Sequence, residues 1–346
     1  MRLLFVTQVV DRGDAVLGFV PSWIEGLAGH CEALDVLSIE VGDAGGLPGN
    51  VKVSSLGRES GRTWAARLGT YMGALRKIRT DCILVHMVPR FVLPAAFLVP
   101  GRPPIVLWYT HSGTNLALRA GHALSRKVLT ASPESFPLRS TKVVVTGHGI
   151  DTEMFVRRGA HVPGRLVTVG RATPSKDLET LLRAVAQLVA DGRSVHLEIL
   201  GGGLNSKDDR YLEQMVVLAD DLGLNDVVEF CGVVPYTGIP ERVQGADVFL
   251  SASQTGSLDK AVLEAMAAGV PAVTMNPSFR SMLEPRGLWS ENGQPSDLAA
   301  ATARVLDLAS GEREALGISL REEVVRNHGK ERLLERIAAE CEVLAS

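Results

Sequence analysis

The sequence predicts an α/β protein built from two doubly wound halves, each a parallel sheet covered by helices. Short runs of β-branched and aliphatic residues alternate with helical patterns along all 346 residues, as they do in parallel sheets. This length exceeds the size at which a single core stops growing, so two domains are expected. With 46% hydrophobic and 22% charged residues, the composition is that of a folded protein.

Twelve strands are expected, seven in the first half and five in the second. The first set covers residues 3–9, 34–39, 51–56, 82–88, 105–110, 128–131 and 142–146. The second covers residues 166–170, 196–200, 227–230, 247–251 and 271–275. The polar stretch 151–165, which contains Gly159 and Pro163, is the expected linker. We therefore assign domains to 1–156 and 157–330, and we expect a last helix over 331–346 to pack back on the first domain.

The sequence pattern disfavours a secreted protein, a membrane-spanning protein and a zinc-binding protein. Gln8 and Asp11 interrupt the first apolar run too early for a signal peptide, and Pro94 and the Gly-Arg-Pro-Pro turn at 101–104 divide the longest other apolar stretch. The four cysteines lack zinc-site spacing. We expect a cytoplasmic protein with reduced cysteines and no membrane-spanning segment.

Charge is distributed unevenly along the chain. Residues 1–150 hold 16 Lys and Arg against 10 Asp and Glu, whereas 151–346 hold 20 against 29. The segment 61–80 contains five cations and no acid, interleaved with apolar residues. A basic amphipathic helix is predicted there, and such helices either lie on anionic membranes or pack on a sheet with a solvated outer face.

Glu264 is the only formal charge between Ala261 and Val273. Ser257 or Asp259 can cap the start of a helix here, and Gly269 can end it. Glu264 then lies in the early turns of a short apolar helix. An ionised carboxylate is costly to bury alone, so it either faces water or accepts hydrogen bonds from a ligand such as a ribose diol.

Arg171 and Lys176 follow the first strand of the second half and precede a helix that begins near Ser175 or Asp177. A helix N-terminus carries partial positive charge, so two cations beside it are unfavourable without an anion. A pyrophosphate would accept hydrogen bonds from both side chains and from the helix amides. The alternative is two surface cations balanced by Asp177 and Glu179.

Other nucleotide-binding signals are weak. Gly201–203 follows a strand, but the G-x-G-x-x-G spacing fails at Ser206, so a tight turn is expected. Neither a Walker A sequence nor a D-x-D motif occurs. Phosphate binding by Arg and Lys without a metal or a cofactor is therefore predicted.

These features in this order resemble the retaining glycosyltransferases of family 4, which have the GT-B architecture: two facing Rossmann-like doubly wound domains with a cleft between them. The resemblance covers nearly the whole chain. In the second half it rests on 169–171 with Lys176 and on segments 230–235, 246–250 and 263–271. In the first half it rests on Thr7-Gln8, Gly18, Thr110-His111, and 146–151 leading to Phe155.

The resemblance implies a role for each matching residue. Arg171 and Lys176 would hold the donor diphosphate, Glu264 the ribose diol, and backbone near Val233 would read the base. Gly18 would let the backbone approach the donor, and His111 would face the transferred sugar. The helix entry formed by Ser257, Leu258, Asp259 and Lys260 completes the expected donor site.

The chain departs from the family at Gly256, where a second Glu commonly stands eight positions before the ribose Glu. Metal-independent transfer of a hexose from a nucleoside-diphosphate sugar such as a UDP-sugar is the expected activity. The acceptor would be lipid-linked or a cell-envelope polysaccharide, and we expect an anionic membrane surface but no nucleic acid as a further partner, with the protein peripheral at the inner face. A nucleotide-sugar epimerase of the same architecture and a non-catalytic nucleotide-sugar binder are the alternatives.

Overall fold

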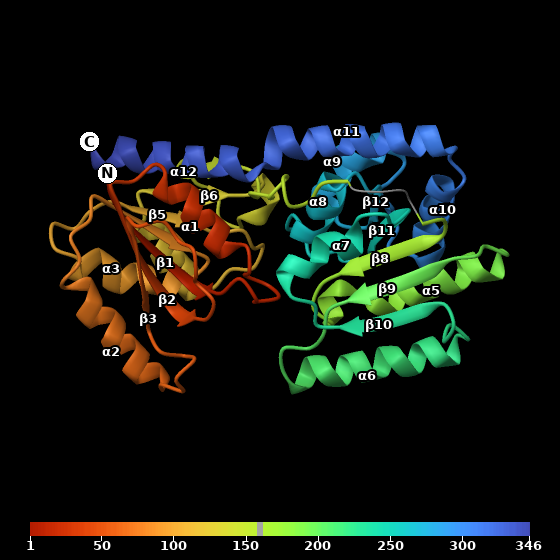
Figure 1. Ribbon diagram of the computed structural model, residues 1–346, viewed down its shortest axis with the longest axis horizontal. Helices are drawn as coiled ribbons and strands as arrows, with labels where there is room; N and C mark the ends of the chain where they lie inside the picture. Colours follow the sequence, from red (N-terminus) through yellow and green to blue (C-terminus); the bar gives the residue numbers. More distant parts are fainter. Residues whose placement is uncertain (158–161) are drawn as a thin grey trace. The chain divides into compact units, whose positions relative to one another are not determined.

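The computed structural model describes residues 1–157 and 162–346, and the chain divides into two compact units (Figure 1). Unit 1 contains Met1–Gly149, Pro235–Thr237 and His328–Ser346, and unit 2 contains Ile150–Val234 and Gly238–Asn327. The first division thus falls between Gly149 and Ile150, earlier than the sequence analysis placed it. Gly159 of the expected linker lies outside the described residues.

Unit 1 is built on a seven-stranded parallel sheet with the order β3-β2-β1-β4-β5-β6-β7. All seven strands occur where the sequence predicts them. They are β1 (Arg2–Val10), β2 (Ala33–Val41), β3 (Val51–Ser55), β4 (Cys82–His86), β5 (Ile105–Trp108), β6 (Lys127–Thr130) and β7 (Val143–Val145). The residues of β4 and β5 are all buried, as expected for central strands covered on both faces.

Helices accompany this sheet from both ends of the chain. They are α1 (Val20–Ala28), α2 (Trp64–Leu75), η1 (Pro89–Phe91), α3 (Val92–Leu98), α4 (Leu116–Leu124), η2 (Pro133–Ser135) and the C-terminal α12 (Lys330–Ala345). The last helix contacts α1 and β4, and it buries Leu333, Leu334 and Ile337. Residues more than 300 positions apart in the sequence therefore share the core of unit 1.

The basic segment 61–80 is not one long helix. α2 ends at Leu75, so Lys77, in the turn that follows, and Arg79 both lie beyond it. The chain must leave the helix there because Thr80 and Asp81 both hydrogen-bond the carbonyl oxygen of Arg2, which aligns β4 beside β1. The predicted five-cation helix is wrong: of the five cations, only Arg67 lies within α2.

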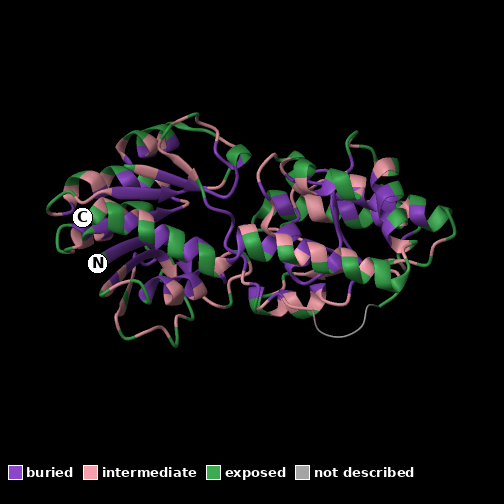
Figure 2. Cartoon of the chain, turned by 90° about the horizontal axis from the view of Figure 1, so that it is seen from above, coloured by how far each residue is buried: buried purple, intermediate pink, exposed green. Residues whose placement is uncertain are grey.

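Unit 2 contains a five-stranded parallel sheet with the order β10-β9-β8-β11-β12. Its strands are β8 (Arg165–Val169), β9 (His196–Leu200), β10 (Val228–Gly232), β11 (Val248–Ser251) and β12 (Ala272–Thr274). All five occur where the sequence predicts them. In Figure 2 buried residues line the strands of each unit, while the outward faces of many helices are exposed.

The helices of unit 2 alternate with its strands and then continue beyond the last strand. They are η3 (Pro174–Lys176), α5 (Leu178–Ala190), α6 (Ser206–Asp221), η4 (Tyr236–Gly238), α7 (Ile239–Val243), α8 (Lys260–Ala267), η5 (Pro277–Phe279), α9 (Arg280–Leu283), η6 (Glu284–Arg286), α10 (Pro295–Leu306) and α11 (Ser310–His328). The unit division assigns the first two residues of η4 and the last residue of α11 to unit 1. The α/β class with two doubly wound sheets is confirmed.

Candidate functional site

The carboxyl ends of β8, β9 and β10 are joined by backbone hydrogen bonds between the loops that follow them. Gly170 N donates to Leu200 O at 2.9 Å, Ala172 N to Gly202 O at 3.0 Å, and Gly201 N to Gly232 O at 2.8 Å. A Cβ on Gly201 would lie 1.9 Å from Gly170 O. Only glycine allows the loops to pack so closely, and this edge is where open parallel sheets bind ligands.

Lys176 lies in η3, directly after the first of these loops. A Cβ on Gly170 would lie 2.8 Å from Lys176 Cε, so the lysine stem runs along the loop backbone. Its ammonium donates to Asp259 Oδ2 at 2.5 Å. The structure therefore brings together two predicted donor-site residues that lie 83 positions apart in the sequence.

Asp259 also begins α8. Its Oδ1 accepts a hydrogen bond from Ala261 N at 3.2 Å, which makes Asp259, and not Ser257, the N-cap of the two that the sequence offers. Gly269 takes φ 71° just past the end of the helix. The Asp259 carboxylate, the start of α8 and the Lys176 ammonium thus lie next to one another. An anion that binds there can contact both a charged side chain and helix amides.

Glu264 is buried on α8 and pairs with Lys260 one turn earlier, with Nζ and Oε1 2.7 Å apart. Burial lowers the pKa of Lys260, although the nearby Glu264 and Asp151 carboxylates act in the opposite direction. From the sequence, Lys260 is expected in the helix entry of the donor site and Glu264 open to water or a ligand. The structure instead joins the two, so a ribose diol would have to share the carboxylate with Lys260.

Arg171 and Val233 lie on the loops after β8 and β10, and both side chains are exposed, Val233 to 59%. The Val233 Cγ2 atom lies so near Gly202 that a Cβ there would be 2.8 Å from it. Across residues 1–157 and 162–346, Arg171 has no carboxylate partner. Asp177 caps α5 through Thr180 N, and Glu179 pairs with Arg183, so neither predicted surface acid neutralises Arg171.

The turn before α8 is held by two residues that the sequence analysis missed. Asn276 Nδ2 donates to Ser257 O at 2.8 Å, and Ser278 Oγ donates to Gly256 O at 2.6 Å. Both follow β12, and inspecting the carboxyl end of that strand like the others would have found them. The adjacent Leu258 is buried and anchors the turn.

Gly256 has φ 72°, a conformation that favours glycine, and a Cβ added there would meet nothing within 4 Å. The space for a side chain exists at this position, but the backbone disfavours one. The replacement of the family's usual Glu therefore belongs to a turn shaped around glycine and fixed by Ser278.

Two predicted site residues lie in unit 1. Gly18 is packed so tightly that a Cβ would lie 2.5 Å from Asp14 O and 2.6 Å from the Tyr236 Cβ. Gly18 thus packs closely against other residues of this chain, and its predicted contact with a donor stays a prediction. His111 follows β5, is exposed, and accepts a hydrogen bond from Gly113 N on Nδ1 at 2.8 Å. That bond leaves Nε2 as the ring atom available to a substrate.

The described residues contain neither a metal-binding cluster nor a membrane-spanning helix. No group of three or more His, Cys, Asp or Glu side chains there is arranged to hold a metal ion. Within the same part of the chain, no helix combines the length and apolar character needed to cross a bilayer.

In a comparison with known protein families, residues 151–322 match the family described as Glycosyl transferases group 1. The putative colanic acid biosynthesis glycosyltransferase WcaL of Salmonella typhimurium is 27% identical over 57% of this chain and 50% of its own. The amylovoran biosynthesis glycosyltransferase AmsK of Erwinia amylovora is 29% identical over 52% of this chain and 45% of its own. The chain thus spans about half the length of these curated relatives.

Solved structures match the whole chain. Anabaena Alr3699/HepE, in complex with UDP and glucose, superposes with a TM-score of 0.78 at 17% identity, covering 99% of this chain and 100% of the other. Sucrose-phosphate synthase from Thermosynechococcus elongatus gives 0.79 at 16% identity, covering 99% of each chain. The fold is therefore the one that the sequence predicts, with two Rossmann-like units of the GT-B type.

Proposed function

We propose, on the premise that residues 151–322 belong to the group 1 glycosyl transferases, that this protein transfers a hexose from a nucleoside-diphosphate sugar to a glycan acceptor, with retention of the anomeric configuration as in family 4. The meeting of Lys176, Asp259 and the start of α8 carries the proposal. The Lys176 ammonium and the amides at the start of α8 would bind a diphosphate. The buried Glu264 carboxylate on the same helix would bind the ribose.

The proposed reaction breaks the bond between the sugar C1 and the diphosphate oxygen and forms a bond from the acceptor oxygen to C1 on the same face. The acceptor proton passes to the departing β-phosphate, so no separate protein base is needed. Charge grows on the leaving group as this bond breaks. Lys176, the exposed Arg171 and the amides at the start of α8 would stabilise that charge more than they stabilise the bound donor.

The relatives favour transfer over epimerisation, because WcaL and AmsK are both named as glycosyltransferases, of colanic acid and amylovoran biosynthesis. UDP in the complex of the structural neighbour suggests a uridine donor. A non-catalytic binder remains the second candidate because Gly256 supplies no sugar-contacting carboxylate. Incubation with radiolabelled UDP-hexoses and a lipid extract separates the candidates by product: transferred sugar, epimerised donor, or bound donor only.

The first prediction concerns the donor site. Arg171→Ala and Lys176→Ala should each weaken UDP binding by about 1–3 kcal/mol, because diphosphate charge loses a partner. Glu264→Gln should weaken UDP binding but not inorganic pyrophosphate binding, since only the nucleotide has a ribose. Calorimetric titration measures these affinities, with Arg183→Ala on α5 as a matched exposed control. If EDTA abolishes turnover while Arg171→Ala leaves it intact, metal-free transfer is wrong.

For localisation, we propose a peripheral protein at an anionic membrane surface, with a lipid-linked acceptor. Arg76, Lys77 and Arg79 are exposed beyond the end of α2, and each cation near such a surface adds about 1 kcal/mol. The second prediction is that the chain co-sediments with anionic liposomes at low salt and dissociates at high salt. Retention unchanged by the triple substitution of these residues to Ser would contradict it.

A further inference from the structure

A pocket on unit 1 lies at the carboxyl ends of β2, β3 and β4, and its lining includes none of the residues assigned to the donor site. Ile39 near the end of β2 and Leu56 directly after β3 form one wall. Phe91 of η1, which follows β4, forms another. The edge of a parallel sheet where strands end is where ligands bind in this architecture.

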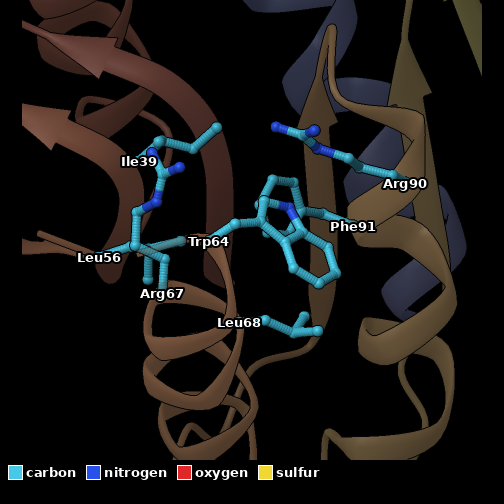
Figure 3. A pocket seen from close by; sticks show the side chains of 7 residues that line it. All are labelled: Ile39, Leu56, Trp64, Arg67, Leu68, Arg90 and Phe91. Atoms are coloured by element: carbon cyan, nitrogen blue, oxygen red, sulfur yellow. The ribbon is translucent and has the colours of Figure 1, made fainter. Parts of the chain in front are cut away.

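The pocket has an apolar part and a cationic part. In the view of Figure 3, Leu68 lies on one side of the Trp64 indole, and the guanidinium groups of Arg67 and Arg90 lie on the other. Trp64 is 56% exposed, although its indole is one of the largest apolar groups in the chain. An aromatic side chain so exposed at the mouth of a pocket is a candidate contact for a ligand.

The two arginines lack anionic partners. Neither Arg67 nor Arg90 forms an ion pair with any carboxylate in the part of the chain that the structure describes. The Nε of Arg67 is buried and has no hydrogen-bond partner there, which is a costly arrangement. Arg90 lies over the Phe91 ring, with its Cζ 5.4 Å from the centroid, so its guanidinium is held at the pocket.

We propose that this pocket binds a phosphate group that carries an apolar chain. A guanidinium pairs with phosphate through two parallel hydrogen bonds, so the two arginines suit such a group better than they suit a neutral sugar. The first carbons of the chain then contact Leu68, Phe91 and the Trp64 indole. The accessible volume inside the pocket is about 50 Å³, so the pocket takes only a few non-hydrogen atoms, and the rest of the ligand would lie at its open mouth.

Binding is tested on the full chain without any donor, so the result is independent of the proposed transfer reaction. Octyl phosphate, kept below its critical micelle concentration, is titrated by calorimetry and by tryptophan fluorescence. Trp64 is the exposed reporter, whereas Trp23 and Trp108 are buried. We expect saturable binding, with affinity reduced about tenfold or more in Arg67→Gln and in Arg90→Gln, and unchanged in Arg119→Gln, an exposed arginine on α4.

Two related ligands test the two halves of the proposal. Inorganic phosphate should bind more weakly than octyl phosphate because it lacks the chain, and octyl glucoside should bind more weakly because it lacks the charge. Equal affinity for either ligand would overturn the proposal, and so would equal octyl phosphate binding by wild type and both arginine variants of unchanged melting temperature. Trp64→Phe should remove the fluorescence change while calorimetric binding persists.

The source of the phosphate is distinguished with vesicles. Co-sedimentation with phosphatidic acid vesicles that is lost in Arg67→Gln would identify a bilayer head group as the occupant. Octyl phosphate binding without such co-sedimentation would identify a single lipid-linked phosphate drawn out of the bilayer. Either result supports the same chemistry in the pocket.

Discussion

Asp259 performs two tasks with one carboxylate. Oδ1 caps α8, and Oδ2 accepts from the Lys176 ammonium. A diphosphate arriving at the proposed site would compete with Asp259 for that ammonium, and its charge would be repelled by the carboxylate. The ion pair therefore keeps Lys176 satisfied while no donor is bound, at the expense of donor affinity.

The third prediction is that Asp259→Asn strengthens UDP binding several-fold. Asparagine caps a helix as well as aspartate does, so α8 should stay intact while the competing charge is removed. Calorimetric titration of UDP measures the change, and Asp259→Ala, which removes the cap as well, is the matched comparison. If Asp259→Asn binds UDP more weakly, the carboxylate orients Lys176 for the donor and does not compete with it.

Single positions of the site could be predicted from the sequence where the signal was local. A cap at Ser257 or Asp259 and the end of the helix at Gly269 follow from residue type and spacing within a dozen residues. The Lys260–Glu264 pair was equally local, because residues four apart face each other on a helix, but it was not recognised. The Lys176–Asp259 pair could not be predicted, because only the fold brings these loops together.

Arg165 and Glu198 tie neighbouring strands of unit 2. Arg165 Nε donates to Glu198 Oε1 at 2.6 Å across β8 and β9, and Arg165 Nη2 donates to Arg242 O at 2.6 Å at the end of α7. Burial acts to raise the pKa of Glu198, but the Arg165 hydrogen bond and the charges of Arg165 and Arg242 outweigh it and lower that pKa. The ionised carboxylate is thus the form that stabilises these elements.

The fourth prediction is that Glu198→Gln lowers the free energy of unfolding of unit 2 by about 1–3 kcal/mol at neutral pH. A lowered pKa in the folded state means that the stabilisation is fully present above the ordinary value of 4.5 and is lost as the pH falls through the lowered pKa. Thermal denaturation of both proteins at decreasing pH measures it. A difference that stays constant below pH 4.5 would contradict the role of charge.

Strands were more predictable than helix ends. Each of the twelve strands is a short aliphatic run bounded by turn residues, so its position follows from the local sequence. The end of α2 does not, because residues 76–79 are compatible with a helix. What ends the helix is the pairing of the next strand with β1, a contact between residues about 80 positions apart. Tertiary structure overrides local propensity there.

At the scale of the whole molecule, the chain returns to its first unit at its end. Leu334 approaches Gly26 of α1 so closely that a Cβ there would lie 2.3 Å from its Cδ1, and Leu333 packs in the same way against Gly149. Ile337 is fully buried beside them. Unit 1 therefore depends on α12 for its core, whereas the proposed donor residues on α8 and η3 lie in unit 2.

The fifth prediction is that Ile337→Ala destabilises unit 1 by about 2–5 kcal/mol, since it removes a buried side chain and leaves a cavity. UDP affinity at a temperature where both units are folded should not change, because the substituted side chain packs only in unit 1. Val343→Ala is the matched control, since Val343 lies on the same helix but is 71% exposed. Calorimetry would show one transition moving to lower temperature in Ile337→Ala, while the transition that UDP raises stays in place. Equal destabilisation by Val343→Ala would contradict the role of Ile337 in the core of unit 1. A fall of UDP affinity in Ile337→Ala would contradict the placement of the donor site in unit 2 alone.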